Sequence, residues 1–373
     1  MADLQKTIKA LLDEIVASGE ELGLQVAVYY RGELVVDAQA GAADTETGTP
    51  VSADTLFTVY SVSKGITATA IHILAEQGKL TYNDPIATHW PEFAQHGKKG
   101  VRVRHALSHL SGIPQMPPDT TDDDVINWSA MCERIAALVP LWPAGETVCY
   151  HSLTYGWILG GLAERVDGRP FARIVDEEIT QPLKLDGLYF GVPKSELGRV
   201  ATLNETAALR DASTATIPNI SPPGSLAGAQ MNRPEIRRSC LPAYGLCTTA
   251  RSLARVYASR IGDGIDGIRL LPPERVRQAT TLQIAGLDAS SGTSLRFALG
   301  YSLGGPDSAI GPRSTAFGHG GYGGAQGYAD PEYNLAVGLT KNRLVVNEPG
   351  IGATWHILNA IRAALGIPVQ RTI

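Results

Sequence analysis

The sequence predicts an α+β protein, with an antiparallel sheet that is flanked by helices and built from both ends of the chain. Three observations support this fold class. β-Branched and aromatic segments separated by turn residues occur near the N-terminus and return towards the C-terminus. Helical patterns fill most of the middle. We therefore predict a discontinuous α/β domain formed by residues 1–78 and 246–373, with a mainly helical domain inserted at residues 79–245.

The first predicted elements are a helix and a hairpin. Apolar residues recur at helical spacing from Leu4 to Val16, and Gly19 then provides a stop. Residues 24–30 and 34–38 follow as two strands joined by a short turn.

A polar loop over residues 44–54 leads to the stretch that the rest of the chain is organised around. The apolar, β-branched residues 56–60 predict a strand that runs into a turn. Residues 62–76 predict a helix that is apolar enough to be buried. Ser61 lies at the junction of the two, and Lys64 follows three residues later.

This junction has the layout of a serine nucleophile with a lysine as its base. Positions i and i+3 share one face of a helix, so the Ser61 hydroxyl and the Lys64 amine can meet. The positive field at a helix N-terminus favours negative charge on a bound reacting group. Burial lowers the pKa of a lysine from about 10.4, towards values that suit a base. The alternative is a capping serine beside a solvated lysine.

The middle of the chain predicts several further helices, although residues 191–223 are rich in loops. The helices cover residues 131–138, 153–165, 170–179 and 250–260.

Tyr150 stands just before the helix predicted at residues 153–165, as Ser61 stands just before the helix at residues 62–76. Its phenol could relay a proton between Ser61, Lys64 and a leaving group. A buried core aromatic is the alternative interpretation.

Two groups of residues have the side chains of metal ligands. His105 and His109 stand at positions i and i+4, and residues 122–124 are three consecutive aspartates. No glutamate lies between the histidines and no third ligand is obvious nearby, so we favour structural or hydrogen-bonded histidines. The acidic run is more simply the charged N-terminus of a helix.

Strand patterns return in the C-terminal part, separated by glycine-rich turns. They cover residues 297–303, 314–317, 325–330 and 335–342, and a closing helix covers residues 353–365. Residues 317–324 hold His319 among several glycines. Because glycine weakens a strand, this composition favours close approach of another group to the backbone. An edge strand with exposed N–H groups can bind an acyl group and donate to an oxyanion.

Three widely spaced motifs carry a resemblance to a known family. They are Ser61-x-x-Lys64, Tyr150-x-Ser152 and His319-Gly320-Gly321. In this order they resemble the motifs of the serine β-lactamase and penicillin-binding-protein superfamily. Segments at residues 80–85, 105–114 and 245–251 resemble connecting sequences of its class C and D-alanyl-D-alanine carboxypeptidase branch. The resemblance covers nearly the whole chain. In pattern the sequence is most similar to the family VIII carboxylesterases. The resemblance implies a β-lactamase/transpeptidase-like fold.

The resemblance also implies roles for individual residues. Ser61 would be the acylated nucleophile, and Lys64 with Tyr150 would form the base and proton relay. The backbone N–H groups of Ser61 and Tyr322 would form the oxyanion hole. Four further residues would bind substrate, namely Ser152, His319, Gly320 and Gly321. The implied reaction is acylation of the serine, loss of the alcohol and attack by water, with acyl transfer to another alcohol where water is outcompeted.

Two departures from the family pattern favour esters as substrates. The second motif usually ends in asparagine, whereas Ser152 reaches less far. The middle residue of the third motif is usually a threonine or serine, and Gly320 lacks that hydroxyl. A site without this donor should bind an anionic β-lactam or peptide terminus poorly. We therefore expect a carboxylesterase of short acyl chains, with β-lactamase or D-amino-acid peptidase or amidase activity as the alternative.

Two other functions remain to be weighed. Residues 300–304 fit the G-x-S-x-G nucleophile elbow around Ser302, and Asp330 and His356 follow in the order of a catalytic triad. That elbow must be followed by a helix, whereas Gly305 and Pro306 come next. A non-catalytic binding protein of the same fold is the other alternative, and the intact motif residues argue against it.

Composition limits the partners and the compartment. Charged residues are 18% of the 373, the net charge is -5, and no basic block occurs, which argues against nucleic acid or an anionic membrane as a partner. We expect a cytoplasmic protein, because no secretory signal, membrane-spanning stretch or C-x-x-C pair is evident. The four cysteines are expected to be reduced and mostly structural. No metal or organic cofactor is implied, the expected partner is a small ester, and the oligomeric state stays open.

Overall fold

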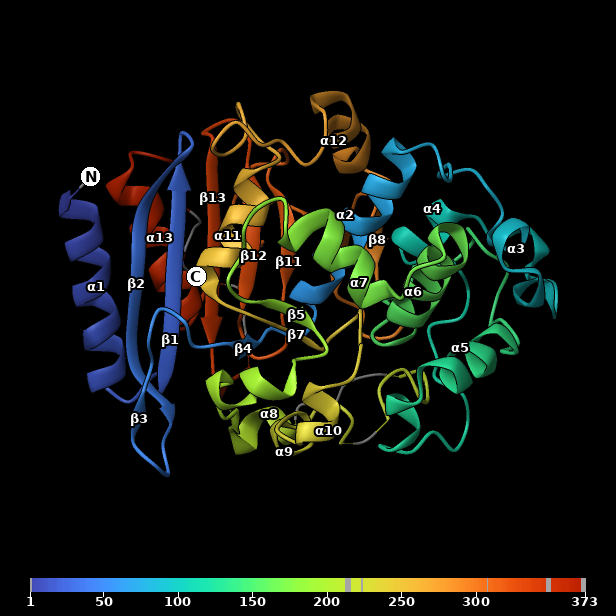
Figure 1. The fold of residues 1–373 in the computed structure, drawn as a ribbon, viewed down its shortest axis with the longest axis horizontal. Coiled ribbons are helices and arrows are strands. Elements are labelled where there is room, and N and C mark those ends of the chain that lie inside the picture. The colour runs from blue at the N-terminus through green and yellow to red at the C-terminus, as the bar shows by residue number, and fades with distance from the viewer. Residues whose placement is uncertain (1, 212–215, 223, 307, 347–349, 370–373) are drawn as a thin grey trace.

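The computed structural model describes residues 2–211, 216–222, 224–306, 308–346 and 350–369, and it contains a large antiparallel sheet. Within these residues, nine strands pair in the order β3-β2-β1-β13-β12-β11-β10-β9-β8. The strands are β1 (Gly23–Tyr30), β2 (Glu33–Asp44), β3 (Thr49–Pro50), β8 (Ile284–Leu287), β9 (Ser294–Phe297), β10 (Ser302–Leu303), β11 (Phe317–Gly320), β12 (Gln326–Asp330) and β13 (Leu335–Lys341). The predicted α+β class, with a sheet drawn from both chain ends, is confirmed (Figure 1).

The centre of the sheet joins the two ends of the chain. Strand β1 pairs antiparallel with β13, with Val28 opposite Val337 and Val26 opposite Leu339. Alternate side chains of β1 point to opposite faces, so Val26 and Val28 lie in one apolar cluster and Ala27 in the other. This alternation requires helices on both faces, because each face carries apolar side chains that must be buried.

Helices α1 (Ala2–Ala17) and α13 (Ala353–Ala364) cover one face of the sheet, and their apolar stripes share a core cluster with β1 and β13. Helices α2 (Val62–Glu76) and α11 (Ala250–Ala258) pack on the opposite face. Helix α2 contacts both β11 and helix α6, so it lies between the sheet and the helices of the middle of the chain (Figure 1). Its position explains why nearly every residue of α2 is buried.

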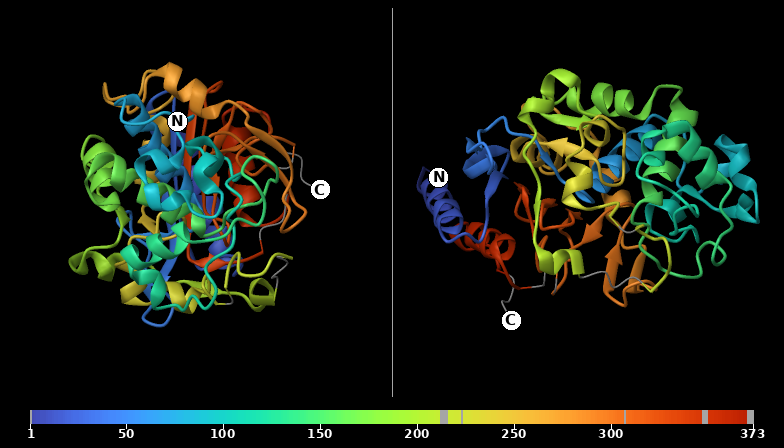
Figure 2. Two further views of the ribbon diagram at one scale, coloured as in Figure 1. Left: turned by 90° about the vertical axis from the view of Figure 1, so that its right-hand side faces the viewer. Right: turned by 90° about the horizontal axis from the view of Figure 1, so that it is seen from below.

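The middle of the chain forms mostly short helices, of which α3 to α6 lie on the side of α2 away from α1 and α13, whereas α8 to α10 lie below the sheet in the view of Figure 1; Figure 2 gives two further views. The α-helices are α3 (Ile86–His89), α4 (Val103–Leu107), α5 (Trp128–Ala136), α6 (Thr154–Asp167), α7 (Phe171–Val175), α8 (Ala207–Asp211), α9 (Gly228–Met231) and α10 (Pro234–Arg237). Short 3₁₀ helices lie at Pro91–Ala94, Lys98–Gly100, Asp124–Ile126 and Lys194–Arg199, and a π-helical turn lies at Asp176–Thr180.

Two small sheets tie this middle region to the rest of the molecule. Strands β4 (Phe57–Thr58), β7 (Leu246–Thr248) and β5 (Leu188–Phe190) form one, and β14 (Arg343–Leu344) with β6 (Asn204–Glu205) forms the other. The strand that leads to Ser61 therefore belongs to a small sheet beside the large one. The division into domains at residues 78 and 245 stays a prediction.

Two strand predictions at the C-terminal side need correction, and two elements there were not predicted. Residues 297–303 do not form one strand, because β9 ends at Phe297 and β10 begins at Ser302. A tight turn separates them, in which Gly300 has a φ of 85° and the Ala298 N–H donates to the Tyr301 carbonyl. Residues 314–316 lie outside the next strand, which starts at Phe317 and includes His319. Helix α12 (Pro273–Thr280) and strand β8 were not predicted.

Within the described ranges, no helix combines the length and apolar character needed to cross a membrane. All four cysteines fall within these ranges and are free thiols, three of them buried.

Candidate active site

Ser61 lies at a sharp turn between strand β4 and helix α2. Tyr60, the residue before it, has a φ of 48°, a conformation that residues other than glycine adopt only when surrounding contacts hold them. The Tyr60 ring is buried against the Tyr322 ring at a centroid distance of 5.3 Å, and its hydroxyl donates to the Leu226 carbonyl. These contacts set the direction in which Ser61 leaves the turn, at the N-terminal cap of α2.

Lys64 lies one helical turn further on and is completely buried. Its Nζ is 3.1 Å from Ser61 Oγ, and it donates to the carbonyls of Ser152 at 2.7 Å and Ala243 at 3.0 Å. Among the described residues, no carboxylate forms an ion pair with this amine. Burial without a counter-charge holds the pKa of Lys64 well below its usual value.

Tyr150 approaches the same two residues from the segment that precedes α6. The Lys64 amine lies 4.9 Å from the centre of the Tyr150 ring, and the phenol interacts with the Ser61 side chain. Burial raises the pKa of Tyr150 well above its usual value, although the contact with Ser61 acts in the opposite direction. The structure therefore brings together the three residues that the sequence assigns to catalysis.

Strand β11 and the residues that follow it bring the third motif next to the turn before Ser61. A Cβ atom at Gly321 would lie 2.3 Å from the Val59 carbonyl oxygen, so glycine is needed for the strand end to approach the turn before Ser61. This approach brings Tyr322 beside Tyr60. Within the described chain, neither the Ser61 nor the Tyr322 backbone N–H is paired with a protein acceptor. Both groups can donate to a bound oxyanion.

His319 lies in β11 and is 4% exposed. Its Nδ1 is 2.7 Å from the Gly320 carbonyl, and its buried Nε2 has no hydrogen-bond partner in the described part of the protein. Burial, assisted by the charge of Lys64, lowers the pKa of His319 to about 3. The imidazole is therefore neutral at pH 7 and supplies no positive charge to the site.

Gly320 and Ser152 occupy the two positions where the sequence departs from the family pattern. A Cβ at Gly320 would lie 3.0 Å from the amide of Gln326, the residue that faces it on β12. The Ser152 hydroxyl accepts a hydrogen bond from Ser221 at 2.9 Å. Both positions are thus next to polar side chains that the motifs do not include.

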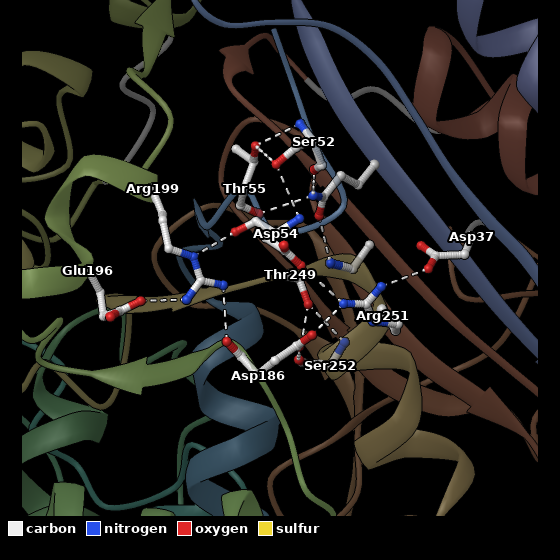
Figure 3. A network of polar contacts seen from close by, with 12 residues as sticks. Asp37, Ser52, Asp54, Thr55, Asp186, Glu196, Arg199, Thr249, Arg251 and Ser252 are labelled. Atoms are coloured by element: carbon white, nitrogen blue, oxygen red, sulfur yellow. Dashed lines mark hydrogen bonds and ion pairs between the residues drawn. The ribbon is translucent and has the colours of Figure 1, made fainter. Parts of the chain in front are cut away.

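A polar network holds the segment that leads to β4 and Ser61 (Figure 3). The Gln25 amide donates to the carbonyls of Ser52 and Thr55, and its oxygen accepts the N–H of Ala250 at the start of α11. Arg251 on the same helix pairs with three aspartates, and Arg199 donates to the Asp54 carbonyl. The aspartates are Asp37, Asp54 and Asp186. Strand β1, helix α11 and the segment before Ser61 are thereby fixed to one another.

The alternative elbow around Ser302 is not assembled. Ser302 lies in strand β10, paired with Phe297 and Gly318, and among the described residues the next regular element is strand β11 and not a helix. Asp330 accepts the N–H of Glu332, two residues along its own chain, and His356 is exposed on α13. These residues do not form a triad.

His105 and His109 are hydrogen-bonded, as the sequence predicts. His105 Nδ1 accepts the Arg102 N–H, and His109 Nδ1 accepts the His151 N–H. Across the described residues, no group of three or more His, Cys, Asp or Glu side chains is arranged to hold a metal ion.

Sequence reasoning missed three residues that contact the site: Ala243, Ser221 and Asp288. Ala243 contributes only its backbone carbonyl to Lys64, which any residue type can do, so no signal marks it. Ser221 lies in a segment rich in serine and proline that carries no regular pattern. Asp288 accepts the Tyr150 N–H from a turn after a strand that was not predicted.

Comparisons with known proteins show the family and the fold of the chain. A model of the family described as Beta-lactamase matches residues 8–362. The chain is 35% identical over 362 residues to the protein named Esterase/beta-lactamase LipL of Mycobacterium tuberculosis (strain ATCC 25618 / H37Rv), covering 91% of this chain and 83% of that one. The structure of a penicillin-binding protein homologue from Caulobacter crescentus superposes with a TM-score of 0.85 at 33% identity, over 98% of this chain and 97% of that one. A family VIII carboxylesterase superposes with a TM-score of 0.89 at 28% identity, over 96% and 97% of the two chains.

Proposed function

The chain belongs to the Beta-lactamase family and is a serine hydrolase of that superfamily, and we propose that it hydrolyses carboxylic esters through an acyl-enzyme on Ser61. The observation that carries this proposal is the environment of Lys64. Its amine is 3.1 Å from Ser61 Oγ and 2.7 and 3.0 Å from two backbone carbonyls. It is also fully buried.

This environment makes Lys64 a base for Ser61. A neutral amine has two N–H groups and one lone pair. The carbonyls of Ser152 and Ala243 accept the two N–H groups, so the lone pair is left for the third neighbour, the Ser61 hydroxyl. Burial lowers the pKa of Lys64 well below its usual value, which favours this neutral form.

The reaction then runs in two halves. Ser61 Oγ attacks the acyl carbon and passes its proton to Lys64, while the N–H groups of Ser61 and Tyr322 stabilise the oxyanion. Tyr150, neutral because its pKa is raised, relays the proton to the departing alcohol oxygen. Water repeats the same steps on the acyl-enzyme and releases the acid. A second alcohol in place of water would give acyl transfer.

The charges around the site support a neutral ester over an anionic substrate. His319 has a pKa of about 3 and offers no cation to a substrate carboxylate at pH 7, and burial lowers the pKa of Lys64, which disfavours its charged form. Gly320 lacks the hydroxyl that a threonine or serine would supply there. A β-lactam or a peptide carboxylate would therefore bind without its usual partners, at a cost of desolvation. We place short-chain esters first among the substrates.

Hydrolysis of β-lactams is the second candidate, and the name of one relative favours it. The Mycobacterium tuberculosis protein that is 35% identical to this chain is named both esterase and beta-lactamase. The two activities share the acyl-enzyme chemistry and differ in the recognition of the substrate carboxylate.

The test compares two substrates and two variants. We expect the wild type to hydrolyse p-nitrophenyl butyrate faster than a chromogenic cephalosporin. Ser61→Ala should lower kcat/KM for the ester by roughly 10³-fold or more, because it removes the nucleophile. Ser302→Ala is the matched control and should retain the wild-type rate.

Each contrary outcome has a distinct meaning. Loss of activity in Ser302→Ala alone would overturn the assignment of Ser61. A cephalosporin rate above the ester rate in the wild type, lost in Ser61→Ala, would keep the nucleophile but make the protein a β-lactamase.

A further inference from the structure

Asp288 is a buried carboxylate that belongs to none of the three motifs, yet it contacts the segment of Tyr150. It lies in the turn between β8 and β9 and is 4% exposed. Its Oδ1 accepts the Tyr150 N–H at 2.8 Å, and its Oδ2 accepts the hydroxyls of Ser290 and Ser291 at 2.6 Å each. Among the described residues it forms no ion pair. Its charge is therefore balanced by hydrogen bonds alone.

The next peptide group is held in the same way from another direction. The His151 N–H donates to Nδ1 of His109 at 3.1 Å, and His109 is 1% exposed. Because this Nδ1 accepts a hydrogen bond, the ring hydrogen of a neutral His109 lies on Nε2. The His109 ring also packs on the Tyr150 ring at a centroid distance of 4.6 Å.

These two bonds fix the backbone on both sides of the Tyr150 Cα. Tyr150 lies outside regular structure, since α6 begins only at Thr154, so no helix or strand bond orients it. The neighbouring Ala289 N–H also donates to the Val148 carbonyl, which ties the turn to the segment at a second point. The direction of the Tyr150 ring towards Ser61 therefore depends on contacts with the turn and with His109.

We propose that Asp288 is a positioning residue that holds the Tyr150 phenol in place for proton transfer. The inference rests on the proposed function, because it takes Tyr150 as the proton relay. A side chain held within a few tenths of an ångström transfers a proton efficiently, and a displacement of about 1 Å can cost about 10²-fold in rate. Substrate contacts are not involved, so the effect belongs in kcat and not in KM.

The experiment compares Asp288→Ala with Asp288→Asn for p-nitrophenyl butyrate, with thermal unfolding measured for each variant. We expect Asp288→Ala to lower kcat about 100-fold with KM within about twofold of wild type. Asp288→Asn keeps an oxygen acceptor for the Tyr150 N–H and should restore kcat to within about fivefold. Ser291→Ala removes a hydrogen bond to the far carboxylate oxygen and should leave kcat unchanged. If Asp288→Ala does not fold, Asp288→Ser, whose hydroxyl is too short to reach the Tyr150 amide, takes its place.

A Tyr150→Phe background separates positioning from general damage. There Asp288→Ala should cause little further loss, because the group that it positions has been removed. An equal loss in both backgrounds, or a folded Asp288→Ala with wild-type kcat, would overturn the proposal. An Asp288→Asn variant as slow as Asp288→Ala would also contradict it.

The failure of this inference can be told from failure of the proposed function. If Ser61→Ala and Tyr150→Phe retain the wild-type ester rate, the proposed function fails. If both are slow while Asp288→Ala is normal, only the positioning role fails. The rate at which a fluorophosphonate labels Ser61, read by mass spectrometry, gives the same comparison without an ester substrate.

Discussion

At the residue scale, the site depends on a buried amine that has no counter-ion. Lys64 is surrounded by a hydroxyl, two backbone carbonyls and the rings of Tyr150 and Tyr155. Transfer of a charged ammonium into such surroundings is costly, so the ammonium form of Lys64 is a stronger acid than it is in water. The same surroundings that make Lys64 unfavourable as a cation make it useful as a base.

Replacement of Lys64 by arginine tests this interpretation. Arginine remains protonated at every accessible pH, so it has no lone pair to accept the Ser61 proton. We expect Lys64→Arg to lower kcat/KM by about 10²–10⁴-fold at pH 7, without recovery at higher pH. The measurement is the ester rate from pH 6 to pH 9.

Lys98→Arg is a control for the burial of a larger cation. Lys98 is a second buried lysine, and it donates to the carbonyls of Gln95 and Leu138. Lys98 lies outside the site, so its replacement should change the free energy of unfolding while the folded enzyme keeps its kcat. If Lys64→Arg retained activity, Lys64 would not be the base.

At the element scale, several elements meet through glycines that allow backbones to approach closely. Gly338 in β13 faces helix α11, where a Cβ would lie 2.2 Å from the Ala250 carbonyl oxygen. Because that oxygen belongs to the backbone, a side chain at this position must push the whole helix away from the sheet. Helix α11 begins with Ala250 and Arg251, which take part in the network behind Ser61.

Gly338→Ala should therefore destabilise the fold, by about 3 kcal/mol. Gly286→Ala is the matched control, because Gly286 also lies in a strand of the same sheet and a Cβ there meets nothing within 4 Å. It should change stability by less than about 1 kcal/mol. Urea unfolding of the two variants gives the comparison, and equal midpoints would contradict the packing argument.

The elements with a strong helical period could be predicted from the sequence, whereas short strands could not. The helices at residues 62–76 and 250–258 follow from apolar spacing. The strand prediction for residues 297–303 was wrong because its apolar residues belong to a turn that Gly300 makes possible. Tertiary packing decides such short segments.

The residues of the candidate site also differ in whether the sequence alone could reveal them. Ser61 and Lys64 could be found from their spacing at the junction of a strand and a helix, and Tyr150 and the third motif from their resemblance to family motifs. Ala243 could not, because it acts through a carbonyl that every residue has. Asp288 could not, because its contact with Tyr150 joins positions 138 residues apart in the chain. Only the fold brings such pairs together.

At the scale of the whole molecule, buried histidines link stability to pH. Burial lowers the pKa of His72 to about 3, that of His151 to about 4 and that of His319 to about 3. In the unfolded chain a histidine has a pKa of about 6.5. Between these values the unfolded chain binds protons that the native state does not, so the free energy of unfolding falls as the pH falls below about 6.5.

Each of these histidines should contribute a slope of about 1.4 kcal/mol per pH unit in that range. His72 is suited to a test, because it lies away from Ser61 and bonds the Tyr82 hydroxyl and the Leu299 carbonyl. Urea midpoints at pH 7.5, 6 and 5 should decrease, and His72→Gln should make the decrease shallower. A wild-type midpoint that stays constant down to pH 5 would contradict this account.

The pairing of β1 with β13 has a consequence for biosynthesis. Val28 leaves the ribosome long before its partner Val337, which lies about 300 residues later in the sequence. At about 5–20 residues per second, an unpaired apolar strand persists for roughly 15 to 60 seconds. The nascent chain is therefore expected to need protection from aggregation. A circular permutant that carries residues 1–44 after residue 373 should shorten the time for which β1 is unpaired and raise the yield of native protein.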